Sequence, residues 1–483
     1  MTILMMMPMN RLMLMLVTTD NTALELTEAQ QRDKDNLSLI ANKSIGELVK
    51  ANPELLIFPD RLNDNEDDIA CDPILELALT DAKTVLTTGN IMGFIGVKNT
   101  QLKIQSRFAQ SVVDDASDVD TLANNQVASL EDYFLHYMLQ KVLCFNLFDL
   151  KHSHNQTKVF DFLVYLFPYF LKKALSQGLY KEYQKKAYND SNLKGTIDIK
   201  AHLQRNLPFQ GSVAYRVREH SFDNPLTQLI RHTIELIKQK PNLRDVLHSD
   251  SETLDFVNLI VQHTSSYHVR NRHTVINANR KPFVHPYFTE YRGLQKICLQ
   301  ILRHDGLKYA NNDDKAYGIL FDGAWLWEEY LNTLLRTIGY KHPTNNNRQG
   351  GINVYAQKLS GNNVRRYPDF VKDDRIILDA KYKRMKGNHI NRDDLNQVLS
   401  YLFLYQANIG GYIAPTIDNN LALNMGSLNG FGGSTHKFKL AIPQQVASYQ
   451  AFKTAITQNE AKLIEAIKAL SSEQSDNESL AIS

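Results

Sequence analysis

Alternating apolar and polar residues in the first part of the chain predict β-structure. Residues 53–108 have a β-leaning pattern, in which the runs Ile91–Val97 and Leu102–Phe108 flank the polar residues Lys98-Asn99-Thr100. Two apolar runs joined by a short polar segment are typical of a hairpin. Residues 109–128 are acidic and rich in turn-forming residues, so a linker or exposed loop is expected there.

Helical periodicity dominates the middle of the chain. From Leu130 to about Tyr188, apolar residues recur three and four positions apart, which predicts helices with an aromatic-rich core. Residues Leu193–Ile199 interrupt this pattern. Residues 221–240 resume it, with Asn224-Pro225 as a helix start, and long helices are expected to about His304.

A different order of elements begins at Ala316. A helix at Trp325–Ile338 is followed by a polar loop, by strands and by a second helix at Asp393–Gln406. The elements expected after it are a strand at Gly411–Ala414, a glycine-rich loop at 423–434, a strand at Phe438–Ile442 and a helix at 445–470. Strands interleaved with helices in one unit predict a mixed α/β sandwich.

The composition is that of an ordinary globular protein. The chain has 483 residues, of which 43% are hydrophobic and 22% charged, and its formal net charge is +2. The length predicts two or three domains, and the charge excludes a polybasic nucleic-acid coat. The methionine-rich start is interrupted by Pro8 and Arg11 and is too short to span a membrane, so we expect no membrane association. It is interpreted either as a disordered leader at 1–20 or as the result of a start codon assigned upstream of the true one. A disordered tail is expected at 471–483.

Cysteine usage gives no sign of a disulfide framework. The three cysteines, Cys71, Cys144 and Cys298, lie far apart, and there is no CxxC or Cys/His cluster. Neither disulfides nor a zinc site is therefore expected, and a reducing, cytoplasmic location fits the sequence.

The strongest chemical signal lies between Arg365 and Arg384. Pro368-Asp369 is followed by a polar turn centred on Asp373-Asp374, and then by an apolar run that ends in Asp379-Ala380-Lys381. A hairpin with this turn brings Asp369 and Asp379 nearly opposite each other. Strand alternation puts Asp379 and Lys381 on one face. Burial of such charges is costly unless they are paired or bind a metal.

Two carboxylates at a strand end are suited to Mg²⁺, together with a backbone carbonyl such as that of Ala380. Such an ion activates water for phosphodiester hydrolysis, and Lys381 can orient that water or stabilise developing charge. Asp-x-Lys occurs elsewhere, for example at Asp81-Ala82-Lys83. Only here do Pro-Asp, a turn, an apolar strand and Asp-x-Lys follow one another. The alternative is a surface hairpin whose charges form salt bridges.

Two flanking helices offer further polar residues. Glu328 shares its helical face with apolar residues, which predicts an inward third carboxylate, whereas Glu329 shares its face with polar ones. A glutamate favoured by the helix dipole is the alternative for Glu328. In the later helix, Asp394, Gln397 and Tyr401 share one face. Gln397 is either a residue that holds the water or a phosphate, or an ordinary polar helix residue.

The segment around the hairpin is locally basic. Nine Lys and Arg residues and four Asp residues lie from Arg365 up to Arg392, a local net charge of +5. This excess suits contact with a phosphate backbone. A solvated basic face is the alternative.

These motifs make the sequence similar to the PD-(D/E)xK nucleases, and more narrowly to the McrC family of nuclease subunits in McrBC-type restriction systems. The resemblance covers roughly residues 85–445. Its most specific part runs from Gly178-Leu179-Tyr180 to Gly195-Thr196-Ile197-Asp198, although Lys194 stands where the family often has Arg. The other segments that resemble the family are Gly93-Phe94-Ile95-Gly96, Asp223-Asn224-Pro225-Leu226 and Leu326-Trp327-Glu328-Glu329-Tyr330.

The resemblance implies a mixed α+β fold with three parts. It implies a β-leaning N-terminal domain that contacts a partner at 21–125 and a mainly helical middle region at 126–312. The third part is a PD-(D/E)xK restriction-endonuclease-like α/β domain at 313–470.

The resemblance also implies roles for five residues. Asp369 and Asp379 would ligate Mg²⁺ with Glu328 in support, Lys381 would be catalytic, and Gln397 matches the glutamine of the helix after the motif. The partner implied is an McrB-like AAA+ GTPase that recognises modified double-stranded DNA. This chain has no GxxxxGK[ST] motif and is not expected to hydrolyse nucleotide itself.

The expected function is therefore a Mg²⁺-dependent DNA endonuclease subunit that acts with a separate GTPase. Two alternatives stay open at this point. One is a non-catalytic adaptor that stimulates the GTPase, and the other is a stand-alone PD-(D/E)xK nuclease.

Overall fold

The computed structural model shows a mixed α+β protein, as the sequence predicts. Contacts divide the chain into two units, of which unit 1 comprises residues 1–144 and 312–483 and unit 2 comprises residues 145–311. The residues that the structure describes are 15–26, 30–52, 55–59, 73–80, 83–98, 100–109, 132–143, 157–241, 243–248, 250–304, 316–343, 351–357, 364–383, 391–430 and 432–481. The linker predicted at 109–128 lies almost entirely outside them.

The N-terminal part of unit 1 is built on a five-stranded sheet. Its strands, in spatial order, are β1 (Met15–Thr19), β7 (Thr100–Gln105), β6 (Ile91–Val97), β11 (Ala316–Asp322) and β3 (Leu55–Phe58). The antiparallel pairing of β6 with β7 confirms the predicted hairpin. Gly93 has a φ of +135°, and a Cβ there would meet the Ile319 carbonyl at 2.2 Å, so only glycine lets β11 approach so closely.

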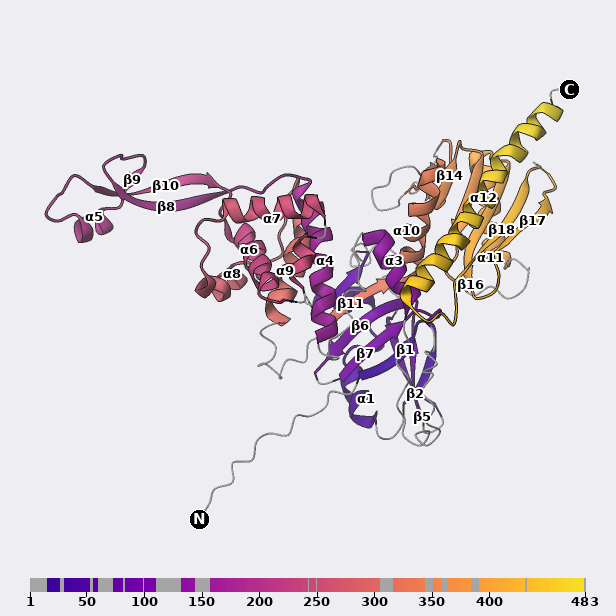
Figure 1. Cartoon of the computed structure of the whole chain (residues 1–483), viewed down its shortest axis with the longest axis horizontal. Helices are drawn as coiled ribbons and strands as arrows, with labels where there is room; N and C mark the ends of the chain where they lie inside the picture. Colours follow the sequence, from indigo (N-terminus) through magenta and orange to yellow (C-terminus); the bar gives the residue numbers. More distant parts are fainter. Residues whose placement is uncertain are drawn as a thin grey trace, which may run out of the picture. The chain divides into compact units, whose positions relative to one another are not determined.

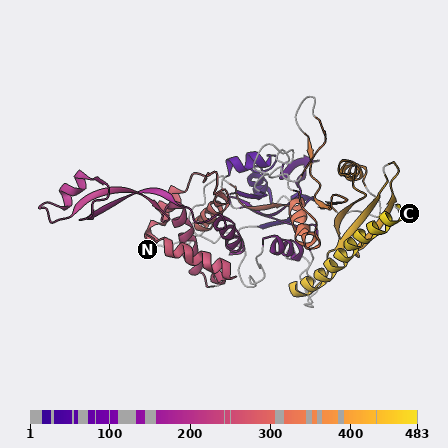
Figure 2. The same ribbon diagram turned by 90° about the horizontal axis from the view of Figure 1, so that it is seen from above.

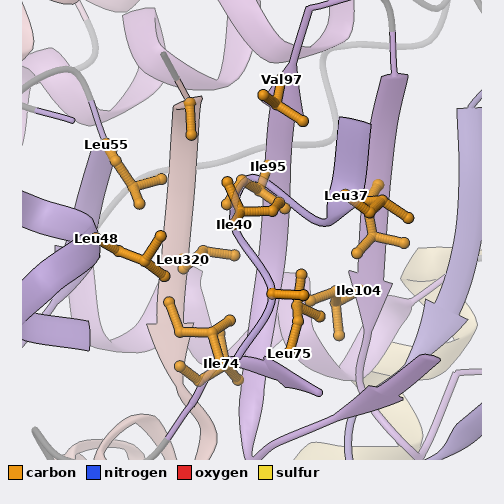
Figure 3. Close-up of a cluster of buried hydrophobic side chains, with 14 of the residues drawn as sticks. Leu37, Ile40, Leu48, Leu55, Ile74, Leu75, Ile95, Val97, Ile104 and Leu320 are labelled. Carbon is orange, nitrogen blue, oxygen red and sulfur yellow. The ribbon is translucent and has the colours of Figure 1, made fainter. Parts of the chain in front are cut away.

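A layer of short elements covers one face of this sheet. The elements are α1 (Gln31–Leu37), α2 (Ile45–Ala51) and a three-stranded sheet of β2 (Ala23–Leu26), β5 (Lys83–Thr88) and β4 (Leu75–Thr80). Figure 3 shows apolar side chains of this cluster, in which Leu48, Ile74 and Ile40 of the covering layer are gathered with Ile95 and Leu320 of the sheet. Burial of these side chains stabilises the sheet, whose strand β11 continues into the C-terminal part of unit 1.

The C-terminal part of unit 1 has its own five-stranded sheet. Its strands, in spatial order, are β14 (Phe370–Lys372), β15 (Ile376–Ala380), β16 (Ile409–Thr416), β18 (Ser434–Ala441) and β17 (Leu421–Ser427). The helices of this part are α3 (Tyr133–Leu143), α10 (Gly323–Leu335), a 3-10 turn at Arg336–Ile338, α11 (Arg392–Tyr405) and α12 (Tyr449–Ala481). A short pair, β12 (Ile352–Asn353) and β13 (Arg365–Arg366), precedes β14.

Helices cover both faces of this sheet. A Cβ on Gly410 of β16 would meet Val398 and Leu402, so α11 packs on the face of even-numbered β16 residues. Trp327 of α10 donates to the carbonyl of Ile413, and Figure 2 shows α12 lying along the sheet. This is the sandwich predicted for the C-terminal region.

Three expectations in unit 1 differ from the structure. Residues Met15–Thr19, predicted within a disordered leader, form β1 because their branched residues pair with β7 and bury Leu16. Part of the predicted glycine-rich loop is β17, which pairs with β18 and is irregular between Asn424 and Gly426. The tail predicted as disordered from residue 471 continues α12 to Ala481.

Unit 2 consists of a helical body and a long two-stranded arm (Figure 1). The body contains α4 (Thr157–Leu175), α6 (Pro225–Lys238), α7 (Ser251–His263), α8 (Arg272–Ala278), α9 (Tyr291–His304) and 3-10 turns at Arg244–His248 and Val269–Asn271. The arm contains β8 (Glu182–Asp190) and β10 (Val213–Ser221), with β9 (Thr196–Ile197) and α5 (Ile199–Arg205) toward its far end.

The helix start at Asn224-Pro225 is confirmed, because the Asn224 side chain caps α6. The prediction that helical structure continues to about Tyr188 is wrong. The helix ends at Leu175, Gly178 adopts a φ of +96°, and the chain then enters β8. Among the helices of the described residues, none combines the length and apolar character needed to cross a bilayer.

Candidate active site

The predicted hairpin of Asp369 and Asp379 is confirmed by the register of β14 and β15. Phe370 pairs with Leu378 in antiparallel fashion, which places Asp369 and Asp379 at the next position along the ladder. Asp373 and Asp374 both have positive φ, at 52° and 54°, and Arg375 donates its amide to the Lys372 carbonyl. These angles resemble the turn types that match the twist of paired strands.

The two aspartates converge in a poorly solvated place. Asp379 is 1% exposed, and the Asp369 Oδ2 accepts a 2.6 Å hydrogen bond from the amide of Ala380. Burial, then the neighbouring Asp379 and then Glu328 raise the pKa of Asp369 well above its usual value. Burial also raises the pKa of Asp379, although Lys381 opposes that effect. Two carboxyl groups are therefore held together in a place that disfavours their charged forms.

Lys381 is the cation that faces them, as strand alternation predicts. Its Nζ lies 2.5 Å from Asp379 Oδ2 and 4.0 Å from Asp394 Oδ1. It also donates a 2.6 Å hydrogen bond to Gln397 Oε1. Burial alone would lower the pKa of Lys381, but Asp379 and its other acidic neighbours raise it, so the ammonium stays charged.

The predicted polar face of α11 points at this cluster. The Gln397 amide nitrogen donates to the Tyr401 hydroxyl at 3.0 Å, and Tyr401 donates to the Tyr367 carbonyl at 3.3 Å. Asp394 forms an ion pair with Lys383. Gln397 is thus placed where it orients the Lys381 ammonium, a contact that the sequence pattern had not specified.

Both α10 glutamates lie near a histidine that sequence reasoning missed. The His342 Nε2 lies 3.5 Å from Glu328 Oε1 and 3.9 Å from Glu329 Oε1. Glu328 also adds to the negative charge around Asp369, as expected of an inward carboxylate, and Glu329 is likewise drawn toward His342. No motif surrounds His342, so only its place three residues after Gly339 and beside the hairpin reveals it.

Tyr382 and Trp327 anchor this end of the sheet to the rest of unit 1. The Arg107 guanidinium lies 4.7 Å from the centre of the Tyr382 ring, and the Tyr382 hydroxyl donates to Met92 Sδ at 3.4 Å. The carbonyl of Ile413 accepts from both Trp327 Nε1 and the amide of Lys381. The strand end that bears Asp379 and Lys381 is therefore held by the contacts of Tyr382 with Arg107 and Met92, and by the hydrogen bonds to Ile413.

The donors present fit a Mg²⁺ ion. Asp379 raises the pKa of the neighbouring Asp369, and the two carboxylates form a negative pocket that a divalent cation would neutralise. Among the described residues, no group of three or more His, Cys, Asp and Glu side chains is gathered as a metal cluster. Two carboxylates completed by a carbonyl and waters suit Mg²⁺, which retains several waters when bound.

The basic residues around the hairpin are only partly placed. Arg365 and Arg366 form β13 and are exposed, whereas Lys381 and Lys383 are engaged with acidic side chains. The residues at 384–390 lie outside the described ranges. A basic face toward a phosphate backbone therefore stays a prediction.

The block that made the resemblance specific builds the arm of unit 2. Gly195 lies against β10, where a Cβ would meet the Arg216 carbonyl at 2.2 Å. Asp198 caps α5 through the amide of Ala201 and forms an ion pair with Arg216. Tyr180 packs in an aromatic cluster at the base of the arm. Close packing, helix capping and aromatic packing therefore account for the residue types at Gly195, Asp198 and Tyr180.

Fold and site together define a mixed α+β protein with paired carboxylates and a lysine at a sheet end. A family model described as "McrBC 5-methylcytosine restriction system component" matches residues 86–414. This range exceeds half of the chain, so the chain belongs to that family and is a component of an McrBC-type restriction system. The resemblance found in the sequence is thereby confirmed. A search of curated proteins found no match.

Two solved structures with similar chains come from Thermococcus gammatolerans. One is a refined half-complex from a tetradecameric assembly of McrB AAA+ hexamers with bound McrC, with 15% identity and a TM-score of 0.47 over 94% of this chain and 100% of that chain. The other is a cryo-EM structure of the McrBC complex, with 11% identity and a TM-score of 0.31 over 68% of this chain and 90% of that chain.

Proposed function

We propose that this chain is the Mg²⁺-dependent DNA endonuclease subunit of its McrBC-type system, and that residues 313–470 contain a PD-(D/E)xK nuclease domain. The observation that supports this most is the convergence of Asp369 and Asp379 beside Lys381 at the end of β15. Buried like charges are costly, and a purely structural hairpin would gain nothing from keeping both. Perturbed carboxylates grouped with a lysine are typical of catalytic sites.

Asp369, Asp379 and the Ala380 carbonyl are the groups that would hold Mg²⁺. When bound, the ion supplies Lewis acidity and a nucleophilic water for phosphodiester hydrolysis. Lys381 stabilises negative charge that develops on the phosphate oxygens, and the Gln397 side chain fixes the direction of its ammonium group. Glu328 supports the acidic end of the site from α10.

A separate McrB-like AAA+ GTPase is the proposed partner, with modified double-stranded DNA as the substrate. The sequence has no GxxxxGK[ST] motif with which to bind the phosphates of a nucleotide. Resemblance to the McrC subunits supports a division of labour in which the partner hydrolyses GTP and this chain cleaves DNA.

The test is Asp379→Asn in the complex reconstituted with its cognate GTPase. We expect Mg²⁺- and GTP-dependent cleavage of methylated plasmid DNA to fall on the order of 1,000-fold or more, because one of two metal carboxylates is gone. Stimulation of GTP hydrolysis by this chain should persist, because the substitution keeps the shape of the side chain.

The matched control is Asp374→Asn, an exposed aspartate in the turn of the same hairpin. Asparagine tolerates positive φ, so this variant should keep both activities. Unchanged cleavage by Asp379→Asn with intact GTPase stimulation would favour the adaptor. Mg²⁺-dependent cleavage by the chain alone, without GTP or a partner, would favour a stand-alone nuclease.

A further inference from the structure

His342 occupies the junction between the α10 carboxylates and the strand that bears Asp369. We propose that His342 is a positioning residue of the metal site, which fixes Asp369 and Glu328 relative to each other. The inference rests on the proposed metal-dependent function and adds a residue that lies outside the PD-(D/E)xK motif. It stands on hydrogen bonds and packing among described residues.

The first contact is with the backbone of Asp369. The His342 Nδ1 lies 2.7 Å from the Asp369 carbonyl oxygen. A carbonyl oxygen only accepts hydrogen bonds, so Nδ1 must bear the proton in this contact. Because the Asp369 Oδ2 accepts from the Ala380 amide, the residue is held at its backbone by His342 and at its carboxylate by β15.

The second contact is with α10. With Nδ1 bound to Asp369, the opposite side of the ring presents Nε2 to Glu328 and Glu329, at 3.5 and 3.9 Å. One imidazole therefore joins the helix to the strand across the acidic end of the site. Histidines that bind metals through one nitrogen are commonly oriented by a partner on the other, and here the same device orients a carboxylate ligand instead.

The local fold leaves His342 little freedom. Gly339 ends the 3-10 turn after α10 with a φ of +89°, which redirects the chain toward β14. Lys341 then pairs with Val371 through two backbone hydrogen bonds of 2.8 and 2.9 Å. The His342 ring stacks on Phe370 at 5.3 Å, and its side chain is 8% exposed. The ring is thus positioned before any ligand binds.

Three substitutions separate the two contacts. His342→Phe keeps the stacking on Phe370 and removes both polar contacts. His342→Asn places an amide nitrogen where Nδ1 lies, so it can still donate to the Asp369 carbonyl, whereas His342→Gln reaches toward the position of Nε2. The matched control is His436→Asn, since His436 is also a buried histidine of this sheet but bonds Ser434.

The experiment measures Mn²⁺ binding to the intact purified chain by electron paramagnetic resonance. A separate Asp379→Asn variant gives the level of binding that does not depend on the proposed site. We expect His342→Phe to weaken Mn²⁺ binding by about 10- to 100-fold, as loss of residues that orient ligands does. His342→Asn should recover a large part of that loss and His342→Gln less, because Asp369 is the ligand. The His436→Asn control should bind as the native chain does. Circular dichroism and thermal melting show which variants retain the fold.

Native Mn²⁺ affinity in a folded His342→Phe variant would overturn the positioning role and leave the proposed function intact. Equal losses in His342→Asn and His342→Phe would also overturn it, because the Asp369 contact would then do nothing. If the native chain binds no more Mn²⁺ than Asp379→Asn, the metal site itself falls, and this inference falls with it.

Discussion

Unit 1 contains two acid–base clusters that differ in the ratio of carboxylates to cations. At the N-terminal sheet, Asp20 accepts hydrogen bonds from the Arg107 amide at 2.6 Å and from Arg107 Nε at 2.8 Å, and it forms an ion pair with the same guanidinium. Arg107 also donates to Asn90 at 2.9 Å. One carboxylate therefore meets one cation, and both oxygens of Asp20 are bonded.

The cluster at the end of β15 holds two carboxylates against one ammonium. Asp369 and Asp379 share Lys381, which also lies near Asp394. The pairing of one carboxylate with one cation at Asp20 is the more stable arrangement, because an uncompensated buried charge costs several kcal/mol. The excess of carboxylates at Asp369 and Asp379 supports the proposal that this site binds a cation. The clusters are linked, since Arg107 packs on Tyr382, the neighbour of Lys381.

The largest difference between the clusters should be seen with Asp379→Asn. Beside the loss of DNA cleavage described above, we expect this variant to melt at the same temperature as the native chain or higher when Mg²⁺ is absent. The substitution removes a charge that burial disfavours, as the raised pKa of Asp379 indicates, while Lys381 keeps its bond to Gln397. Differential scanning calorimetry with EDTA measures this effect. A clearly lower melting temperature would show that the pair is structural.

Asp20→Asn should have the reverse effect. It leaves the Arg107 guanidinium, 11% exposed, without its counter-charge, which we expect to destabilise unit 1 by roughly 3–5 kcal/mol. Cleavage per folded molecule in the reconstituted complex should stay within a few-fold of the native value, because Asp20 touches no group of the proposed site. Urea unfolding and a cleavage assay below the melting temperature measure the two quantities. Loss of cleavage with unchanged stability would contradict the comparison.

His232 in α6 of unit 2 extends the comparison to a buried base. It is 1% exposed, and neither ring nitrogen has a hydrogen-bond partner among the described residues. Burial, then the charges of Arg272 and Arg231, lower the pKa of His232 to about 4, while Glu235 opposes them. Below pH 6.5 His232 therefore binds a proton in the unfolded chain but stays neutral in the folded chain. The free energy of unfolding should fall as the pH drops from 6.5 toward 4.

Substitution of His232 should have a smaller effect than Asp379→Asn or Asp20→Asn. His232→Leu should gain stability relative to the native chain as the pH is lowered from 7 to 5, when urea unfolding of the full chain is followed by hydrogen exchange in α6. His248→Gln, at an exposed histidine of the same unit, is the control and should show no such trend. A stability difference between His232→Leu and the native chain that is independent of pH would contradict the buried, neutral imidazole.

Much of the candidate site could be predicted from the sequence because it is local. The turn at Asp373-Asp374 and the strand period fix which residues face each other, so Asp369, Asp379 and Lys381 follow from a stretch shorter than fifteen residues. The face of α11 with Gln397 follows from the helical period in the same way. The metal ion, the role of Gln397 and the role of Glu328 stay predictions until they are tested.

The sequence by itself determined the periodic elements, the acidic hairpin and the family. Only the tertiary structure decided that β11 pairs with β3 and β6, where the amide of Ala316 bonds to Asn52, 264 residues away. It also decided that His342 meets Asp369 and that Arg107 meets Tyr382. The physical reason is that the period of a strand or helix shows which side is buried, whereas the partner of that side depends on contacts between distant segments. For the hairpin of Asp369 and Asp379, the sequence determined which side chains face each other, and packing determined which distant residues hold them in place.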